Sequence, residues 1–311
     1  MISLYHPSYE PQNWQQFLLY ILFILAAFAI NVFLTRLLPY ITQTAFMWSL
    51  GGFAIICITV LSTASPDYQS GHFVYGEFMN ETGWPDGLAW LLGLLQGALG
   101  LTGFDACAHM IEEIPEPHLK GPKIMIYCIL IGMATGFIFL SVLLFVLTDV
   151  DLVNSSANGP ILEILYQATG SRAGATCLLI FPLGCLCFAT IGIMSTSSRM
   201  TYAFARDGGL PFSRVWAKVH PKLDTPVNAL ALTTGLVIIF GCIFLGSSSA
   251  FNAIIAASVV ALGVSYGIPP AINVLRGRKM LPETRAFKLP NWLGWTCNVV
   301  SVPPSFSTLE D

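Results

Sequence analysis

The chain has 311 residues, of which 55% are hydrophobic and only 10% are charged, and its mean hydropathy is +0.70. Charged residues make up about a quarter of an ordinary soluble domain, so this composition excludes that class and indicates a protein that crosses a membrane several times. The formal net charge of −3 adds nothing by itself, but the positions of the charged residues are informative.

Seven apolar segments are long enough to cross a bilayer as helices, since a span needs about 20 apolar residues and must satisfy its own backbone. They cover residues 16–34, 42–64, 87–111, 124–148, 174–199, 227–245 and 249–275. An eighth segment, 292–303, is shorter and runs into a polar, proline-rich tail. We therefore expect residues 1–311 to form one all-helical, polytopic transmembrane domain with about seven full spans and a stub.

The basic residues fall on one side of this arrangement. If the spans alternate across the membrane, every lysine and arginine except Arg172 lies on the same side. Basic loops are typical of the cytoplasmic side, so the N-terminal segment is expected to be extracytoplasmic. The two N-x-S/T sequons begin at Asn80 and Asn154. Both lie in loops on the outer side and are candidate glycosylation sites.

The third segment, 87–111, has the features of a broken span. Four glycines recur in it at helical spacing and predict a face for close helix packing: Gly93, Gly97, Gly100 and Gly103. We expect the helix to unwind at 102–104, directly before Asp105. An ionisable residue inside a span is costly and is a functional-site hypothesis by default. Many transporters build a substrate site from a span broken near the membrane midplane.

Asp105 also has a purely structural interpretation, as a residue that caps the helix after the break. His109 lies four residues later and shares its helix face. The pattern His109-x-x-Glu112-Glu113 lacks the paired histidines of zinc hydrolases, so we expect no metal. Glu112, Glu113 and Glu116 are interpreted as a solvated cluster where the span leaves the membrane, with part of an inner gate as the alternative.

The fifth segment ends in a run of hydroxyl side chains, 195–198. Such side chains commonly bond to carbonyls of their own helix. The alternative is that Ser195 or Ser198 faces the broken span and lines an ion or substrate path. The sequence Asp207-Gly208-Gly209 predicts the end of this helix. We find no nucleotide-binding loop and no nucleophile–base pair, so we expect neither an enzyme nor a use of ATP or another cofactor.

Two of these stretches resemble the signatures of amino-acid permeases. They are TGFDACAHMIEEIP, residues 102–115, and SRMTYAFARDGGLPFS, residues 198–213. The chain is similar to the amino acid–polyamine–organocation (APC) superfamily, and within it to the fungal GABA/choline-type permeases. The resemblance implies an inverted-repeat (LeuT-like) fold and secondary transport of amino acids or related amines, such as GABA, choline and polyamines, by alternating access.

The resemblance also implies roles for particular residues. Thr102, Gly103, Phe104 and Asp105 would occupy the break in the family's sixth helix, where backbone carbonyls hold a substrate amine. Phe104 could add a cation–π surface for an ammonium group. Ser195 and Ser198 would fall near a position that other superfamily members use for a coupling sodium.

The resemblance covers only part of the family's pattern. The seven spans would correspond to the fourth to tenth helices and the stub to the eleventh, and the glycine-rich break of the family's first helix has no counterpart here. The sequence is therefore interpreted as an incomplete copy of the transporter fold, truncated at both ends.

Two functions stay open at this point. One is transport of a small amino acid or amine across a bilayer, most simply the plasma membrane, with a vacuolar or other endomembrane as the alternative. The other is a membrane fragment without transport activity that pairs with or regulates a full permease. Neither requires nucleic acid or ATP.

Overall fold

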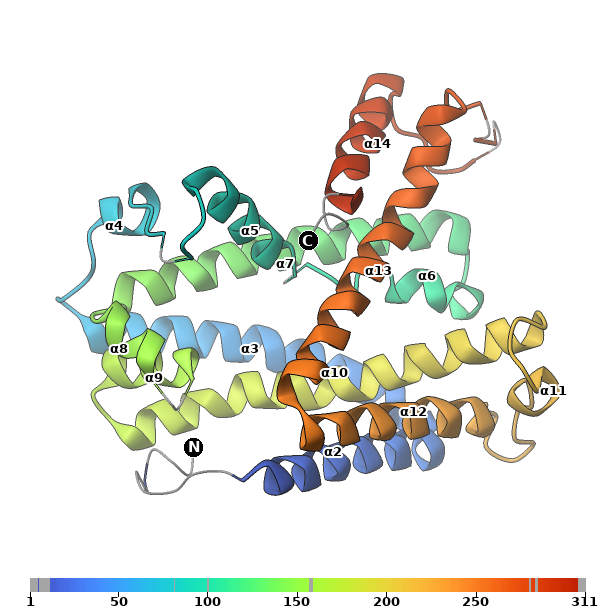
Figure 1. Cartoon of the computed structure of the whole chain (residues 1–311), viewed down its shortest axis with the longest axis horizontal. Coiled ribbons are helices and arrows are strands. Elements are labelled where there is room, and N and C mark those ends of the chain that lie inside the picture. The colour runs from blue at the N-terminus through green and yellow to red at the C-terminus, as the bar shows by residue number, and fades with distance from the viewer. Residues whose placement is uncertain are drawn as a thin grey trace.

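The computed structural model describes residues 5, 12–80, 82–99, 101–156, 159–279, 281–282 and 285–306, excluding the side chains of 95–99 and 302–306. Within these residues the secondary structure is helical apart from one isolated β-bridge between His220 and Thr225. The expected all-helical architecture is therefore confirmed. Most long helices run side by side along the longest axis of the molecule (Figure 1).

Six of the described helices are long and apolar enough to cross a membrane. They are α2 (Asn13–Phe33), α3 (Leu38–Ala64, preceded by the short turn η1, Thr35–Leu37), α7 (Pro117–Val146), α10 (Arg172–Arg206), α12 (Val227–Gly246) and α13 (Ser248–Leu275). They overlap every expected span except the third. Two extend furthest beyond their apolar segments because a local signal sets one end of each: α7 begins with Pro117, and α10 stops before Gly208, whose φ is 79°.

The third expected span is not one continuous helix, and this difference reduces the seven expected spans to six continuous helices. It is divided into α5 (Asp86–Leu99), α6 (Ala106–His109) and η2 (Ile111–Glu113). Gly103, between α5 and α6, has a φ of 88°, a left-handed conformation that glycine adopts at little cost. The helix is thus interrupted where the sequence predicts.

The short helices lie at the two ends of the bundle. Figure 1 shows α4 (Gly71–Gly76), α8 (Val150–Ser155) and α9 (Pro160–Thr169) towards one end and α6 and α11 (Ser213–Trp216) at the other. Each set joins helices that alternate in direction along the long axis.

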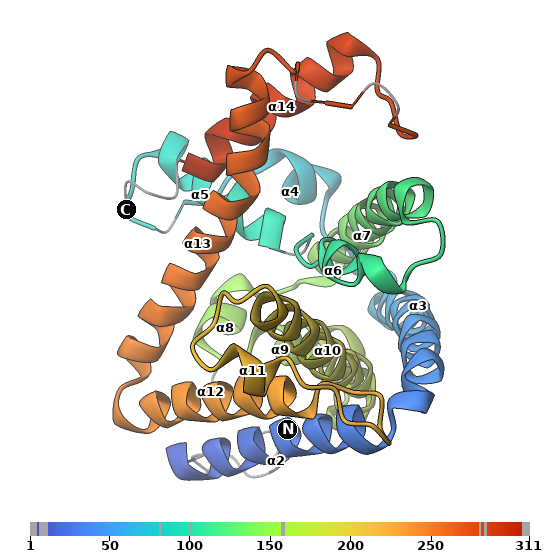
Figure 2. The ribbon, with the colours of Figure 1, turned by 90° about the vertical axis from the view of Figure 1, so that its right-hand side faces the viewer.

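The core consists of two clusters that share α10. One lies between α3, α7, α9 and α10 and includes the fully buried Val60 and Leu162. The other lies between α2, α10 and α12 around Leu230. Figure 2, viewed along the bundle, shows α10 surrounded by these neighbours. Many large apolar side chains on the outer surface are exposed, as is typical of a surface that faces lipid.

The expected close packing against the glycine face of 87–111 is not observed where it can be checked. A Cβ added at Gly93 or Gly103 would meet no atom within 4 Å. Gly100 and the side-chain surroundings of position 97 lie outside what the structure describes. Close helix contact occurs instead between α3 and α10, where a Cβ at Gly52 would lie 2.8 Å from Phe181 Cβ.

Candidate functional site

Asp105 lies at the start of α6 but does not cap it with its side chain. The carboxylate instead lies next to His109, with 2.9 Å between Oδ2 and Nε2, and its side chain is only 17% exposed. The capping interpretation therefore holds for the position of Asp105 and not for its carboxylate. That leaves a half-buried acidic group at the interruption of the span.

Helix α13 closes one side of the break. The rings of Phe104 and Tyr266 are 5.6 Å apart and inclined by 43°. The Tyr266 hydroxyl is buried, meets no hydrogen-bond partner with suitable geometry in the described chain, and interacts electrostatically with Asp105. Tyr266 was not among the residues predicted from the sequence. A signal was present, because a tyrosine next to Gly267 and a Pro-Pro pair interrupts an otherwise apolar span.

Helix α7 closes another side. A Cβ at Gly132 would lie 3.4 Å from Leu101, and the Cys107 thiol donates to the Gly121 carbonyl at 3.8 Å. Thr102 and Gly103 are exposed, whereas Phe104 and Asp105 are partly buried. The structure therefore places the predicted residues 102–105 together, between neighbours that contact α7 and the ring of Phe104 that contacts α13.

Two ion pairs join the segment after the break to the end of α10. Arg206 donates two hydrogen bonds to the Glu112 carboxylate in a bidentate arrangement, with Nη2–Oε1 and Nη1–Oε2 distances of 2.9 and 3.1 Å. Glu113 pairs with Arg199. The hydrogen bonds and charge of Arg206 hold the pKa of Glu112 below its ordinary value. These contacts favour the gate interpretation of the two glutamates over an unattached solvated cluster.

Two serines of the hydroxyl run 195–198, Ser195 and Ser198, make different contacts. Ser198 is buried and its hydroxyl donates to the Ser195 carbonyl at 2.7 Å, the common arrangement within a helix. Ser195 is also buried, but its hydroxyl accepts from Arg199 at 2.8 Å. The structure therefore connects Ser195 to the segment after the break, through Arg199 and Glu113, and leaves Ser198 in its own helix.

A cavity of about 400 Å³ lies between these two segments. Its walls are residues 108–113 on one side and the end of α10, from Arg199 to Asp207, on the other. His109 lines this cavity and also contacts Asp105, so the carboxylate at the break is connected to the cavity through one side chain.

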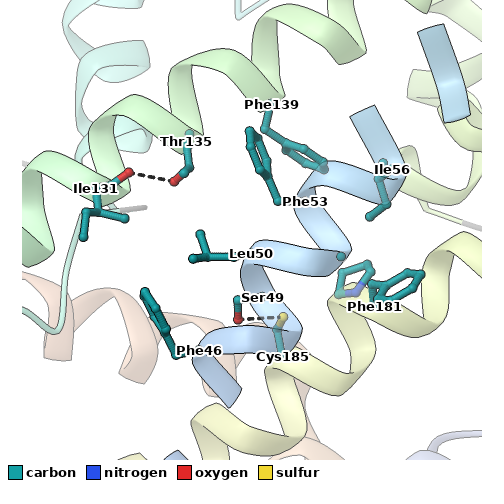
Figure 3. A pocket seen from close by; sticks show the side chains of 13 residues that line it. Phe46, Ser49, Leu50, Phe53, Ile56, Ile131, Thr135, Phe139, Phe181 and Cys185 are labelled. Atoms are coloured by element: carbon teal, nitrogen blue, oxygen red, sulfur yellow. Dashed lines mark hydrogen bonds between the residues drawn. The ribbon is translucent and has the colours of Figure 1, made fainter. Parts of the chain in front are cut away.

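A second cavity, of about 330 Å³, is mostly apolar and lies between α3, α7 and α10. Figure 3 shows four phenylalanines around it, at positions 46, 53, 139 and 181, with Ser49 Oγ 3.3 Å from Cys185 Sγ. It contains none of the residues predicted from the sequence. Its lining offers no charged group that could orient a polar ligand.

The two sequon asparagines lie outside the long helices. Asn80 follows α4, and its amide donates to the Trp84 carbonyl at 2.7 Å and to Asp86 at 2.9 Å. Asn154 is exposed on α8. Both belong to the end of the bundle that carries α4, α8 and α9, and residue 81 of the first sequon lies outside the described residues.

Comparison with known proteins gives a consistent result. Residues 1–308 match the family described as "Amino acid permease". A protein of Macrophomina phaseolina, provisionally named an amino acid/polyamine transporter, is 34% identical over 96% of this chain and 67% of its own length. The choline transporter of Saccharomyces cerevisiae is 33% identical over 100% of this chain and 57% of its own length. The 7-keto 8-aminopelargonic acid transporter of the same yeast is 36% identical over 87% and 51%, respectively. The chain thus spans about half to two thirds of the length of these relatives.

Proposed function

The chain belongs to the amino acid permease family, whose members are multi-pass membrane transporters and not enzymes, and we propose on this basis that it is a secondary transporter of amino acids or related amines. Membership of the family implies the inverted-repeat (LeuT-like) fold. The mechanism we propose is alternating access, in which one group of helices moves against the other around a central substrate.

The observation that carries this proposal is the interruption of the third span beside Asp105. We assign the substrate contact to Thr102, Gly103, Phe104 and Asp105. The partly buried carboxylate and the aromatic pair Phe104–Tyr266 offer a negative charge and two ring faces, which together suit an ammonium group. The relative named for choline transports a quaternary ammonium ion by that name, which is the same chemical class.

The ion pairs after the break suit an inner gate. Glu112–Arg206 and Glu113–Arg199 hold the segment after the break against α10 across the cavity of about 400 Å³. Opening towards that side would require both pairs to separate. Water would replace the exposed Glu112–Arg206 pair at small cost, whereas Arg199 of the other pair is only 23% exposed. We propose that this side is cytoplasmic, in agreement with the positive-inside rule.

Ser195 is the hydroxyl we assign to an ion or substrate path, because Arg199 links it to the gate. Ser198 is assigned a supporting role inside α10, since its hydroxyl is already bonded to the Ser195 carbonyl.

The test measures uptake in yeast cells that lack endogenous choline and GABA permeases. The chain carries a C-terminal fluorescent tag, which reports its amount and its membrane. Radiolabelled choline, GABA, putrescine and a mixture of amino acids are offered separately. We expect saturable uptake of one of them, competed by its unlabelled form, with fluorescence at the plasma membrane.

A chain that is inserted at normal abundance but gives no saturable uptake of any of these compounds would contradict the proposal. The same cells then test the alternative, since a regulator should change the uptake rate of a co-expressed full permease.

A further inference from the structure

Helices α13 and α14 (Asn291–Phe306) form a hairpin that stands away from the main bundle in Figures 1 and 2. The connection between them is strongly basic. Its cationic residues are Arg276, Arg278, Lys279, Arg285 and Lys288. In the described part of the chain none of them forms a salt bridge, in contrast to Arg199 and Arg206 at the gate.

Arg278 is folded back into the hairpin. Its φ is 60° and that of Gly277 is 58°, so the chain turns sharply after α13, and the Arg278 amide donates to the Asn273 carbonyl at 2.8 Å. The guanidinium then lies directly on Gly294 of α14, in the space that a Cβ would need. A left-handed φ is unfavourable for arginine, so the turn is held by the surrounding contacts.

Three polar atoms near the contact between Arg278 and Gly294, which we call the seat, have no hydrogen-bond partner in the part of the chain that the structure describes. Nη1 of Arg278, Oδ1 of Asn273 and Nδ2 of Asn298 are all buried and make no hydrogen bond within the described residues. Asn298 lies four residues after Gly294 and therefore on the same face of α14. Buried polar atoms are nearly always paired, and a buried charge without a partner is costly. Beside the acceptor Oδ1 of Asn273, the seat thus holds two donors, one of them cationic, that have no acceptor in the described chain.

We propose that this seat binds the phosphate of an anionic phospholipid from the leaflet on the basic side. Phosphate oxygens match the planar guanidinium and accept charge-assisted hydrogen bonds. The other cations of the loop attract a negatively charged headgroup, and basic pockets between membrane helices are suited to such lipids.

The surroundings favour a lipid over a free anion. Trp292 and Trp295, 71% and 40% exposed, stand at the start of α14, and tryptophan prefers the depth of the lipid headgroups. Further from the loop along the two helices, Ile272 on α13 and Val299 on α14 are exposed apolar side chains, where acyl chains would lie. A free phosphate ion would make no use of either feature.

The experiment titrates the purified chain, in a neutral detergent, with dioctanoyl phosphatidylserine, dioctanoyl phosphatidylcholine or inorganic phosphate, and follows binding by microscale thermophoresis. We expect saturable binding of phosphatidylserine alone. Arg278→Gln should weaken it by at least about tenfold, because a charge-assisted hydrogen bond is lost. Gly294→Ala keeps the charge but displaces the guanidinium, so it should weaken binding as well. Arg214→Gln, which removes the same charge from the exposed α11, is the matched control and should bind normally.

The outcomes separate the possible sources of the phosphate. Equal binding of phosphatidylserine and phosphatidylcholine, or phosphatidylserine binding that Arg278→Gln leaves unchanged, overturns the proposal. Binding of inorganic phosphate at the same concentrations also overturns it, in favour of a soluble anion. If Arg278→Gln does not give a monodisperse protein, Gly294→Ala decides, because the displaced atoms are the flexible end of a side chain and the fold should tolerate the change. Unweakened binding in that variant would then reject the seat.

Discussion

Asp105 is the residue on which the proposed substrate site depends. Its carboxylate contacts His109 and faces Tyr266, and it does not cap α6. Asp105→Asn keeps the shape of the side chain and removes its charge. We expect this variant to reduce uptake by about ten- to a hundred-fold, the loss of one charge-assisted contact, without changing abundance in the membrane. The reduction is measured as uptake of the labelled substrate, normalised to tag fluorescence.

Asp149 provides the matched control for this substitution. It also begins a short helix, but its carboxylate does cap, accepting from the Leu152 amide at 2.9 Å. Asparagine caps about as well as aspartate, so Asp149→Asn should leave uptake unchanged. If Asp105→Asn behaves like Asp149→Asn, the role assigned to Asp105 is wrong.

The Glu112–Arg206 pair of the proposed inner gate gives a second prediction at the scale of single residues. Glu112→Arg places two cations together and should strongly reduce uptake, as should Arg206→Glu with two anions. The double variant restores an opposite pair and should recover most of the uptake. Exposed ion pairs contribute little to stability, so all three variants should reach the membrane in similar amounts. Failure of the double variant to exceed either single variant would show that the pair has no role in gating.

Acidification gives an independent test of the same pair. Arg206 lowers the pKa of Glu112 from its ordinary value of 4.5, so the pair is fully present above that pH and is lost only as the pH falls through the lowered pKa. Arg206→Gln removes the cause and returns the pKa towards 4.5. In this variant, titration of Glu112 by carboxylate infrared bands should therefore occur at a higher pH than in the wild type. An unchanged midpoint would contradict the pairing.

The residues of the site were predictable to different extents. Asp105 and the break at 102–104 could be predicted because a charge and a flexible glycine stand out in an apolar segment. Tyr266 lies far away in the sequence and meets Phe104 only through the path of α13. Long-range pairing of this kind has no local signal. The partners of Glu112 and Glu113 were missed for the same reason, although all four charged groups were visible in the sequence.

At the scale of helices, one contact between α3 and α10 can be tested with adjacent glycines. A Cβ at Gly52 would lie 2.8 Å from Phe181 Cβ, which cannot easily move, whereas a Cβ at Gly51 would meet nothing within 4 Å. Both alanine substitutions gain the same helix propensity, so their difference isolates the clash. We expect Gly52→Ala to be less stable than Gly51→Ala by about 1–3 kcal/mol. Thermal unfolding in detergent measures this difference, and equal melting temperatures would show that the helices are not so closely packed.

Apolar length predicted where helices lie better than where they end. The segment 174–199 lies within α10, which continues to Arg206 because Asp207 and Gly208 are the first residues able to stop it. Segment 124–148 similarly overlaps α7, which starts earlier, at Pro117, and ends at Val146. The start of α7 and the end of α10 both lie outside the apolar stretch, so hydropathy could not show these two boundaries. Capping residues and prolines determine these boundaries, as was correctly predicted at 207–209.

The arrangement of the whole molecule determines how it sits in the membrane. The start of α7, the end of α10, α11 and the loop after α13 carry most of the basic residues, and Figure 1 shows these parts on the side opposite α8 and α9. The proposals for the gate and the lipid seat both assume that the basic side is cytoplasmic. Orientation is therefore the property on which the rest of the interpretation depends.

Cysteine labelling of intact cells tests this orientation. Asp151→Cys lies on the exposed surface of α8, and Lys218→Cys is exposed after α11. If basic loops face the cytoplasm, a membrane-impermeant maleimide should label Asp151→Cys on intact cells and Lys218→Cys only after permeabilisation. Lys279→Cys in the hairpin loop should behave like Lys218→Cys, because it lies on the same side. The unsubstituted chain, whose own cysteines lie in membrane-spanning helices, beside the break or, in the case of Cys297, in α14, gives the background. The reverse pattern would place the proposed gate and lipid seat on the outer side of the membrane, and labelling of both positions on intact cells would contradict a spanning bundle altogether.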